Sequence, residues 1–480
     1  MKGQQRHFGM GLPVDVRPFL PSAGFFFVML LTLDYPFVLA DVVGSAQGAG
    51  LVVGGLLAAT VLLGACSAFA AVLGLARLQP LWAIPGAVLA VLGLGGAAAG
   101  LGASSGALVM GGVVAGAGLL IVGLLWGALY ARLHGMGEML ACVASSLGIA
   151  ALAEWGVLLV LHHNAPLIYG ASCTIGLMAS AAGAVGLGRR ATPEEPVAVD
   201  GLQMRSLLVD LWPLLCGLGL IFAIVGFTWG DCLFGTRLAG MVGPQGLQTP
   251  FERPFFVALL MAVTLVYVAW RGSASLNLVF QILPLVAASF SLITWLIPMN
   301  DAGVAVQTYK SFSRAMGFAV FAVGTWLYVC TAIAERNLAP NAVLGLCTAF
   351  EALVVLVCCL FVDVFSQEMA AAITPCLTVV YLLSVAIFEI LENSAYASAS
   401  AAVGPDEACG RVAAEYGLSP RETEVLGYLA RGRSATFIAD ELQISPHTVK
   451  THIKRIHEKL GIGSKEEIIS LMEARGVPRG

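Results

Sequence analysis

Long apolar runs occupy most of the chain up to residue 391. A helix that crosses the ~30 Å hydrocarbon core of a bilayer needs about 20 predominantly apolar residues. Runs of this length predict twelve membrane spans, at residues 19–40, 49–73, 81–101, 106–130, 139–161, 165–187, 207–230, 254–270, 276–297, 314–334, 341–363 and 371–391. The pattern therefore predicts an all-α protein with a transmembrane domain at residues 19–391 and a short N-terminal segment at residues 1–18.

Composition agrees with this interpretation, because 58% of the side chains are apolar, 11% are charged and the mean hydropathy is +0.88. These values exclude an ordinary soluble protein. Pro36, inside the first predicted span, is one of several prolines expected to open local backbone groups. Glycines four residues apart, such as Gly50 and Gly54, are candidates for close packing between helices.

Lys and Arg gather in alternate segments between the predicted spans. If the N-terminus is cytoplasmic, the segments on that side contain ten of them before the C-terminal tail, and those on the other side contain four. Cytoplasmic loops of membrane proteins carry an excess of Lys and Arg. Since twelve spans return the chain to its starting side, we expect both termini to be cytoplasmic.

The longest polar interruption between the early spans runs from Arg189 to Arg205, and we expect a central cytoplasmic loop at residues 188–206. This loop divides the bundle into two groups of six spans. Six plus six spans with a central loop resembles the major facilitator superfamily, over residues 19–391. The superfamily's Asp-Arg signature between spans two and three is absent, because Arg77 is the only charged residue from Gly74 to Leu81. The resemblance therefore implies the architecture and leaves transport in doubt.

A different composition begins after the last predicted span. Ser, Ala and Gly dominate residues 392–417, which contain Pro405 and show little periodicity, so we expect a flexible linker there. From Leu418 the chain becomes charged and rich in residues that cap helices. This change predicts a separate small domain at residues 418–480.

The C-terminal segment predicts four short helices. Ser419 and Glu422 form a capping box at the start of the first helix. Ser434 and Ser445 are N-caps for the second and third helices, and Ser464 starts the fourth. Two helices joined by a tight turn form a helix-turn-helix, a fold whose second helix enters a DNA major groove.

The third predicted helix, at residues 446–460, has two chemically different faces. Apolar residues recur at spacings of three and four, as in a helix packed on a small core: Val449, Ile453, Ile456 and Leu460. The other face carries small polar and basic residues: Thr448, Lys450, Thr451, Lys454, Arg455 and Lys459. One interpretation is a recognition helix that binds DNA. The alternative is the solvated face of an amphipathic helix.

The stretch LSPRETEVL, followed by SPHTVKTHIKRIHEKLG, resembles the DNA-binding domain of the LuxR/NarL (FixJ-like) bacterial transcription regulators over about the last 60 residues. By this resemblance, Lys450, Thr451 and Lys454 contact base edges, whereas Thr448, Arg455 and Lys459 lie nearer the phosphates. The expected partner is double-stranded promoter DNA. A bacterial source also implies that the expected membrane is the cytoplasmic (inner) membrane.

The same resemblance implies a homodimer on DNA. Ile468, Leu471 and Met472 are candidates for an exposed apolar edge of the fourth helix that joins two copies. RNA polymerase is a further candidate partner. From Glu415 onward there are ten Lys and Arg against nine Asp and Glu, so we expect modest non-specific DNA affinity and a need for a second contact.

One position departs from the family pattern. The family usually has Glu three residues after the cap that corresponds to Ser434, and this chain has Phe437 there. The second helix therefore loses its capping box and gains an apolar residue. We expect Phe437 either in the domain core or at an interface with another domain.

Several acidic residues lie inside predicted spans, where charged groups are costly and usually face a cavity or a partner. One interpretation is a site for a small ligand, a proton or a cation, lined by Asp34, Glu154, Glu351 and Glu389. The alternative is that each is protonated, or bonded to a neighbouring helix, as a structural contact. The identity of the ligand is not encoded in any recognisable motif.

Other functional signals are missing from the sequence. It contains no catalytic triad, nucleotide-binding loop or paired-His metal motif, and the spacing of its eleven cysteines fits neither metal nor redox sites. We therefore expect no enzyme activity, cofactor or bound metal. The pattern favours a membrane-embedded transcriptional regulator that senses a small molecule. Two alternatives are a secondary transporter with a regulatory DNA-binding domain and a chain whose C-terminal domain binds proteins instead of DNA.

Overall fold

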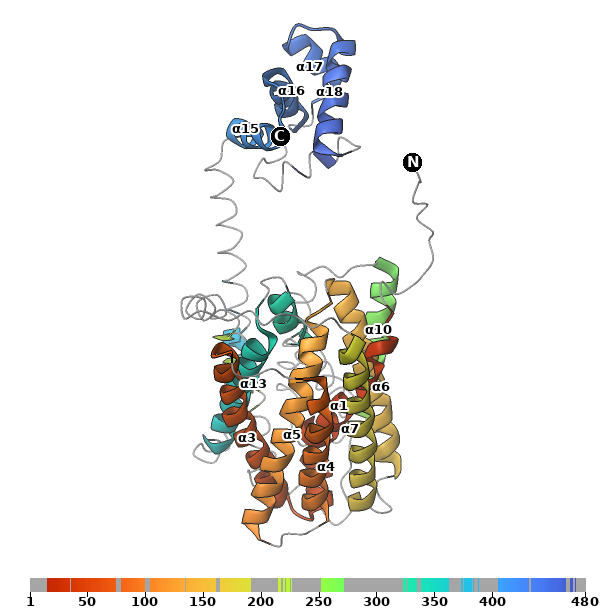
Figure 1. The fold of residues 1–480 in the computed structure, drawn as a ribbon, viewed down its shortest axis with the longest axis vertical. Helices are drawn as coiled ribbons and strands as arrows, with labels where there is room; N and C mark the ends of the chain where they lie inside the picture. Colours follow the sequence, from red (N-terminus) through yellow and green to blue (C-terminus); the bar gives the residue numbers. More distant parts are fainter. Residues whose placement is uncertain are drawn as a thin grey trace. The chain divides into compact units, whose positions relative to one another are not determined.

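The computed structural model describes residues 15–34, 36–74, 79–99, 104–133, 135–160, 165–190, 252–271, 326–334, 338–361, 375–381, 405–430 and 433–462, with scattered positions at 215–226, 323–324, 373–387 and 467–471. Every regular element in these ranges is a helix (Figure 1). The chain divides into two compact units, residues 1–382 and 383–480. The prediction of an all-α protein is therefore confirmed for the described residues.

Six described helices of the first unit are long and apolar enough to cross a membrane. They are α3 (Ala46–Val72), α4 (Ala83–Ala98), α5 (Ser105–Tyr130), α6 (Met136–Val160), α7 (Ala165–Arg190) and α13 (Pro340–Phe361). The span of α4 includes the preceding 3-10 turn and runs from Pro80 to Ala98. A shorter apolar stretch, Pro254–Ala269 within α10 (Glu252–Arg271), coincides with another predicted span. The predicted span at 276–297 lies outside the described residues, and those at 207–230, 314–334 and 371–391 are described only in part, so the count of twelve remains a prediction.

The first predicted span, at residues 19–40, is a broken helix and not a continuous one. It consists of a 3-10 turn (Arg17–Ser22), α1 (Ala23–Met29), a π-helical turn (Leu30–Asp34) and α2 (Pro36–Val43). Pro36 is the first residue of α2, a position at which the missing backbone N–H of proline is tolerated.

Helices α3 and α5 pack closely because glycines face the backbone of the opposite helix. A methyl group at Gly55 of α3 would collide with the carbonyl oxygen of Val109, and one at Gly112 of α5 would collide with that of Val52. Small residues let membrane helices gain van der Waals contact where lipid supplies no hydrophobic drive. Gly54, which the spacing pattern singled out, instead faces open space.

Contacts between α3 and α13, and between α6 and α10, join segments from the two predicted halves of the bundle. Gly64 and Gly345 allow the first of these crossings. A methyl group at Gly64 would lie 2.9 Å from the carbonyl oxygen of Gly345, and one at Gly345 would lie 2.7 Å from that of Gly64. The helices therefore meet almost backbone to backbone.

Buried hydroxyl groups tie the broken first span to the later helices. Tyr130 Oη lies 2.8 Å from Ser22 Oγ and donates to Ser146 Oγ at 3.3 Å, and Ser146 Oγ donates to the carbonyl oxygen of Phe19 at 3.0 Å. Thr32 of the π-helical turn lies 3.0 Å from the Tyr169 hydroxyl of α7 in the same way. These bonds satisfy polar groups that would be costly to leave unpaired in an apolar interior.

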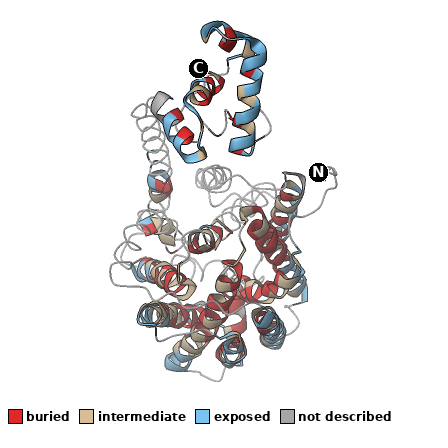
Figure 2. Cartoon of the chain, turned by 45° about the horizontal axis from the view of Figure 1, so that its top comes forward, coloured by how far each residue is buried: buried red, intermediate tan, exposed pale blue. Residues whose placement is uncertain are grey.

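Buried residues of the first unit lie on the helix faces that pack together (Figure 2). Large apolar side chains such as Leu62, Phe69 and Ile175 are exposed on its outer faces. Exposed apolar faces of this extent mark interaction surfaces, and on a bundle of spanning helices lipid is the matching environment. The first unit is therefore that of a membrane protein.

The second unit contains α15 (Pro405–Tyr416), α16 (Pro420–Ala430), α17 (Ala435–Glu441) and α18 (Pro446–Leu460). Their core includes Val412, Val425, Ile438 and Val449, all fully buried. The expectation of a flexible linker through residue 417 is wrong from Pro405 onward. There α15 forms, because its apolar side chains, Cys409 and Val412 among them, have a core to join.

The two neighbouring glycines of α3 provide a test of the packing. We expect Gly55→Val to lower the melting temperature of the detergent-solubilised protein, because overpacking a close crossing costs ~1–3 kcal/mol. Gly54→Val adds the same side chain over open space and should stay near the wild-type value. Thermal unfolding followed by size-exclusion chromatography measures both. Equal loss of monodisperse protein in the two variants would contradict the packing.

Candidate nucleic-acid interface

Capping interactions fix both helices of the helix-turn-helix. Ser434 Oγ accepts the Phe437 N–H at 3.2 Å and starts α17, and Ser445 Oγ accepts the Thr448 N–H at 3.1 Å and starts α18. Between them Gln443 adopts a left-handed conformation with φ +50°, which makes the turn tight. The bounds Pro446–Leu460 predicted for the third helix are confirmed.

Helix α18 separates apolar and basic residues onto opposite faces. Val449 and Ile456 are fully buried in the domain core, whereas Lys450, Thr451, Lys454 and Arg455 are exposed. Thr448 and Lys459 are exposed too, so all six predicted DNA contacts are accessible on one helix. A surface of exposed cations and small side chains on a helix suits a DNA major groove.

The polar side chains on this face make only weak contacts or hydrogen bonds to neighbours within the same helix turn. Thr451 Oγ1 donates to the carbonyl oxygen of His447 at 3.0 Å, and the Thr448 hydroxyl lies 2.8 Å from Ser445 Oγ. Lys454 Nζ lies 3.9 Å from Glu458, but the Lys454 side chain is 79% exposed, so this pair contributes little. Both threonine methyl groups and the lysine remain accessible to a partner.

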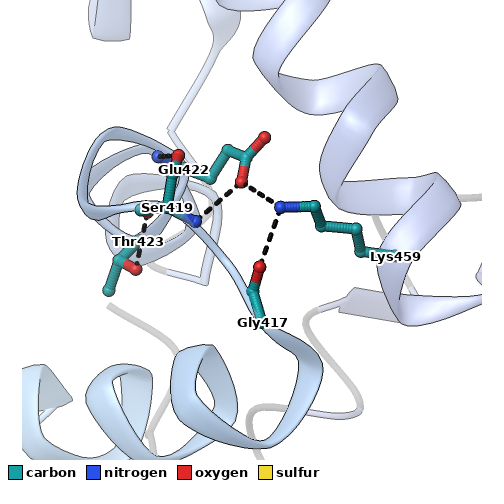
Figure 3. A network of polar contacts seen from close by, with 5 residues as sticks. All are labelled: Gly417, Ser419, Glu422, Thr423 and Lys459. Atoms are coloured by element: carbon teal, nitrogen blue, oxygen red, sulfur yellow. Dashed lines mark hydrogen bonds and ion pairs between the residues drawn. The ribbon is translucent and has the colours of Figure 1, made fainter.

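Lys459, predicted as a phosphate contact, makes polar contacts within the domain. Its Nζ donates to Glu422 Oε2 and to the carbonyl oxygen of Gly417, each at 2.8 Å (Figure 3). The ammonium is thus paired at the edge of the domain, where it connects α18 to the start of α16. The sequence did not reveal this pair because its two partners are 37 residues apart.

The Glu422 carboxylate is buried, and it also closes the predicted capping box. It accepts the Ser419 N–H at 2.8 Å, and the Glu422 N–H donates to Ser419 Oγ at 3.3 Å. The hydrogen bond from Lys459 and the backbone bond from Ser419 lower the pKa of Glu422 from 4.5 to about 2. The carboxylate is therefore charged in the folded domain throughout the neutral range.

Arg421, which sequence reasoning did not single out, extends from the same turn toward the other helix of the motif. Its Nη2 donates to the carbonyl oxygen of Leu442 at 2.8 Å, where α17 ends, and its Nη1 pairs with Glu424. The first turn of α16 therefore contacts both helices of the helix-turn-helix.

Phe437 lies on the surface of the domain and not in its core. Its side chain is 38% exposed, its ring centroid lies 6.3 Å from that of Tyr428, and the Arg433 guanidinium lies 5.0 Å from its centroid. A cation over an aromatic face is attracted by the quadrupole of the ring. This corrects the first of the two predicted alternatives, and an interface through Phe437 remains a prediction.

The residues predicted for dimerisation do not form an exposed edge in the described part of the domain. Ile468 is fully buried in the core, and Leu471 is half-buried against that core. The placement of Ile468 on an exposed edge is therefore wrong, because the small domain uses this side chain to complete its own core. Met472 and most of the predicted fourth helix lie outside the described residues.

The acidic residues predicted to line a ligand site lie on different elements. Glu154 of α6 is 1% exposed, and Glu351 of α13 is half-buried. Asp34 ends the π-helical turn, but its side chain lies outside the described set, as does Glu389 altogether. Among the described residues, no group of three His, Cys, Asp or Glu is placed to hold a metal ion.

Residues 417–472 match the family of bacterial regulatory proteins of the luxR family. A 53-residue segment is 47% identical to the probable transcriptional regulatory protein NarL of Mycobacterium tuberculosis (strain ATCC 25618 / H37Rv), covering 11% of this chain and 24% of NarL. A 52-residue segment is 40% identical to the HTH-type transcriptional regulator MalT of Yersinia pestis (strain Pestoides F), covering 11% of this chain and 6% of MalT. The chain thus spans a quarter or less of these relatives, and its C-terminal domain is a LuxR-type DNA-binding domain.

The membrane unit is similar in fold to a solved structure titled as the major facilitator superfamily proton:xylose symporter XylE bound to 6-bromo-6-deoxy-D-glucose. The TM-score is 0.50 at 14% sequence identity, and the match covers 77% of this chain and 94% of that chain. At this identity the likeness concerns the fold alone. The first unit therefore has a fold similar to that of this symporter structure.

Acid titration tests the Glu422 contacts. Because the pKa of Glu422 is lowered in the folded state, its stabilisation is present above pH 4.5 and is lost as the pH falls toward 2. In a fragment of residues 405–480 at pH 7, we expect the free energy of unfolding of the wild type to be ~1.5–3 kcal/mol larger than that of Glu422→Gln. This is the usual contribution of a hydrogen bond to a charged group. Denaturant unfolding followed by circular dichroism should show this difference shrinking between pH 4.5 and 2. A difference independent of pH would contradict the assignment.

Proposed function

We propose that this chain is a membrane-embedded, one-component transcriptional regulator whose membrane unit senses a small molecule and controls promoter binding by the C-terminal domain. The observation that carries the proposal is the exposed basic face of α18 on a LuxR-type domain, in one chain with a major-facilitator-like membrane unit. A DNA-binding domain with its own membrane unit needs no separate messenger between the sensor and the promoter.

On the DNA side, Lys450, Thr451 and Lys454 contact base edges in the major groove, and Thr448 and Arg455 contact phosphates. Lysine ammonium groups suit the N7 and O6 acceptors of guanine, and threonine methyl groups suit the methyl group of thymine. Lys459 is left out of this set because Glu422 and Gly417 occupy its ammonium. The near-balance of charge in the domain favours binding as a dimer, which doubles the contacts.

On the membrane side, the acidic residues within the bundle are the proposed ligand contacts, with Glu154 and Glu351 described and Asp34 and Glu389 added from the sequence. A buried carboxyl group is retained at membrane depth where it faces a partner or a cavity. A ligand can shift the DNA-binding state only if it binds one arrangement of the bundle more tightly than another. The ligand is therefore a small polar or cationic molecule that stabilises one arrangement.

A second candidate function is a transporter whose C-terminal domain reports substrate flux. The similarity in fold to a protein titled as a symporter supports it. Uptake of radiolabelled candidate solutes into proteoliposomes separates the two functions. Accumulation above that of empty liposomes would favour the transporter, and saturable binding without accumulation would favour the receptor.

Two lysine substitutions test DNA binding directly. We expect Lys450→Ala with Lys454→Ala to weaken promoter affinity of the full-length protein by roughly 10-fold or more, because each base contact is worth ~1–3 kcal/mol. Chromatin immunoprecipitation and target-gene expression should fall together. Arg411→Ala, an exposed cation on α15, is the matched control and should leave both unchanged. If the double variant retains full promoter occupancy, the domain acts through proteins and not through DNA.

A further inference from the structure

Helix α15 is an integral part of the DNA-binding domain. Cys409 and Val412 lie in the same core as the residues of the helix-turn-helix. The helix ends at Gly417, whose φ of +66° is left-handed, and the Leu418 N–H donates to the carbonyl oxygen of Ala413 at 2.8 Å. This is the glycine-terminated end that lets one helix turn sharply into the next. The corner between α15 and α16 is therefore defined by backbone geometry.

The recognition helix is bonded to this corner at its last turn. Lys459 Nζ contacts the carbonyl oxygen of Gly417, at the bend itself, and the carboxylate of Glu422, in the first turn of α16, both at 2.8 Å (Figure 3). Arg421, next to Glu422, donates to Leu442 in the turn that precedes α18. The last turn of the recognition helix and the end of α17, before the turn into α18, are thus both bonded to the region where α15 enters the domain.

We infer that the corner between α15 and α16 transmits the state of the membrane unit to the recognition helix, with Lys459, Glu422 and Arg421 as positioning residues. Helix α15 precedes the corner in the chain, so a force arising in the membrane unit reaches the domain through it. Rotation of α15 about Gly417 moves the Gly417 carbonyl. The bond from Lys459 then either breaks or draws the end of α18 with it, which changes how α18 fits the groove.

This inference rests on the proposed control of DNA binding by the membrane unit. It adds that the influence of the membrane unit on DNA affinity depends on the ion pair between Lys459 and Glu422. If the pair only stabilised the domain, its effect would not depend on what α15 is attached to. A structural role predicts that loss of the pair lowers stability and DNA affinity equally, whether or not α15 is joined to the membrane unit. The coupling role predicts that loss of the pair removes the influence of the membrane unit itself.

The test uses the full-length protein in lipid nanodiscs, with a site-specific protease site introduced between residues 398 and 404. Promoter DNA affinity is measured by fluorescence anisotropy before and after cleavage, which releases the domain with α15 intact. In the wild type, we expect cleavage to change affinity by roughly 5-fold or more, the lower range of allosteric coupling. In Lys459→Met, the ratio of DNA affinities before and after cleavage should approach one. In Lys459→Arg, which keeps a cation at this position, the change in affinity on cleavage should be retained.

Two further variants exclude trivial explanations. Glu422→Gln keeps the bond from Lys459 to Gly417 and should retain part of the effect, and Arg411→Met, on the exposed face of α15, should match the wild type. The inference would be overturned if cleavage changed DNA affinity by the same factor in the wild type and in Lys459→Met. It would also be overturned if the Lys459→Met domain were unfolded by circular dichroism while Glu422→Gln stayed folded and kept the whole effect of cleavage. If cleavage changes nothing in a wild type that binds DNA, membrane control itself fails and the inference fails with it.

Discussion

The Lys459 ammonium holds together three segments of the DNA-binding domain that meet at one point. It donates to the buried carboxylate of Glu422 and to the Gly417 carbonyl oxygen, and so anchors the last turn of the recognition helix. Removing Lys459 would leave the buried carboxylate of Glu422 without its counter-ion, which costs more than the pair itself contributes. The exposed face of α18 can therefore be presented in one orientation while its lysines remain free to contact DNA.

The membrane unit achieves order by a different route. Apolar helices in lipid gain little from burying more apolar surface. Their association therefore depends on glycines, which let two helix backbones approach closely, and on hydrogen bonds between hydroxyl groups. Gly55 and Gly64 permit two such crossings, and Tyr130 and Tyr169 bond the broken first span to the helices around it. The first span contains a π-helical turn at Leu30–Asp34, a feature often found at functional sites.

Local chemistry made much of this structure predictable. The start and end of α18 follow from Ser445, Pro446 and Gly461, whose effects act within one turn of the helix. The six long membrane helices of the described part follow from the length of apolar runs. The role of Lys459 was not predictable, because Glu422 lies in another helix and a surface lysine on a DNA-binding helix usually faces phosphate.

Other differences have the same physical origin. The segment around Cys409 resembles a linker in composition, and it becomes helical because the core of the domain receives its few apolar side chains. The glycine spacing in α3 identified Gly54, whereas its neighbour Gly55 faces the partner helix, since spacing alone does not fix the rotation of a helix. Ile468 was expected at a surface, and it is buried because the domain is too small to leave a large apolar residue unused.

The most direct test of the central claim, that a membrane-embedded chain binds specific DNA through α18, is selection of sheared genomic DNA on the full-length protein in lipid nanodiscs. Captured fragments would be sequenced and compared with those captured by empty discs. The account predicts a discrete set of enriched fragments that share a short sequence motif. Recovery that is uniform along the genome, equal to that of empty discs, would contradict it.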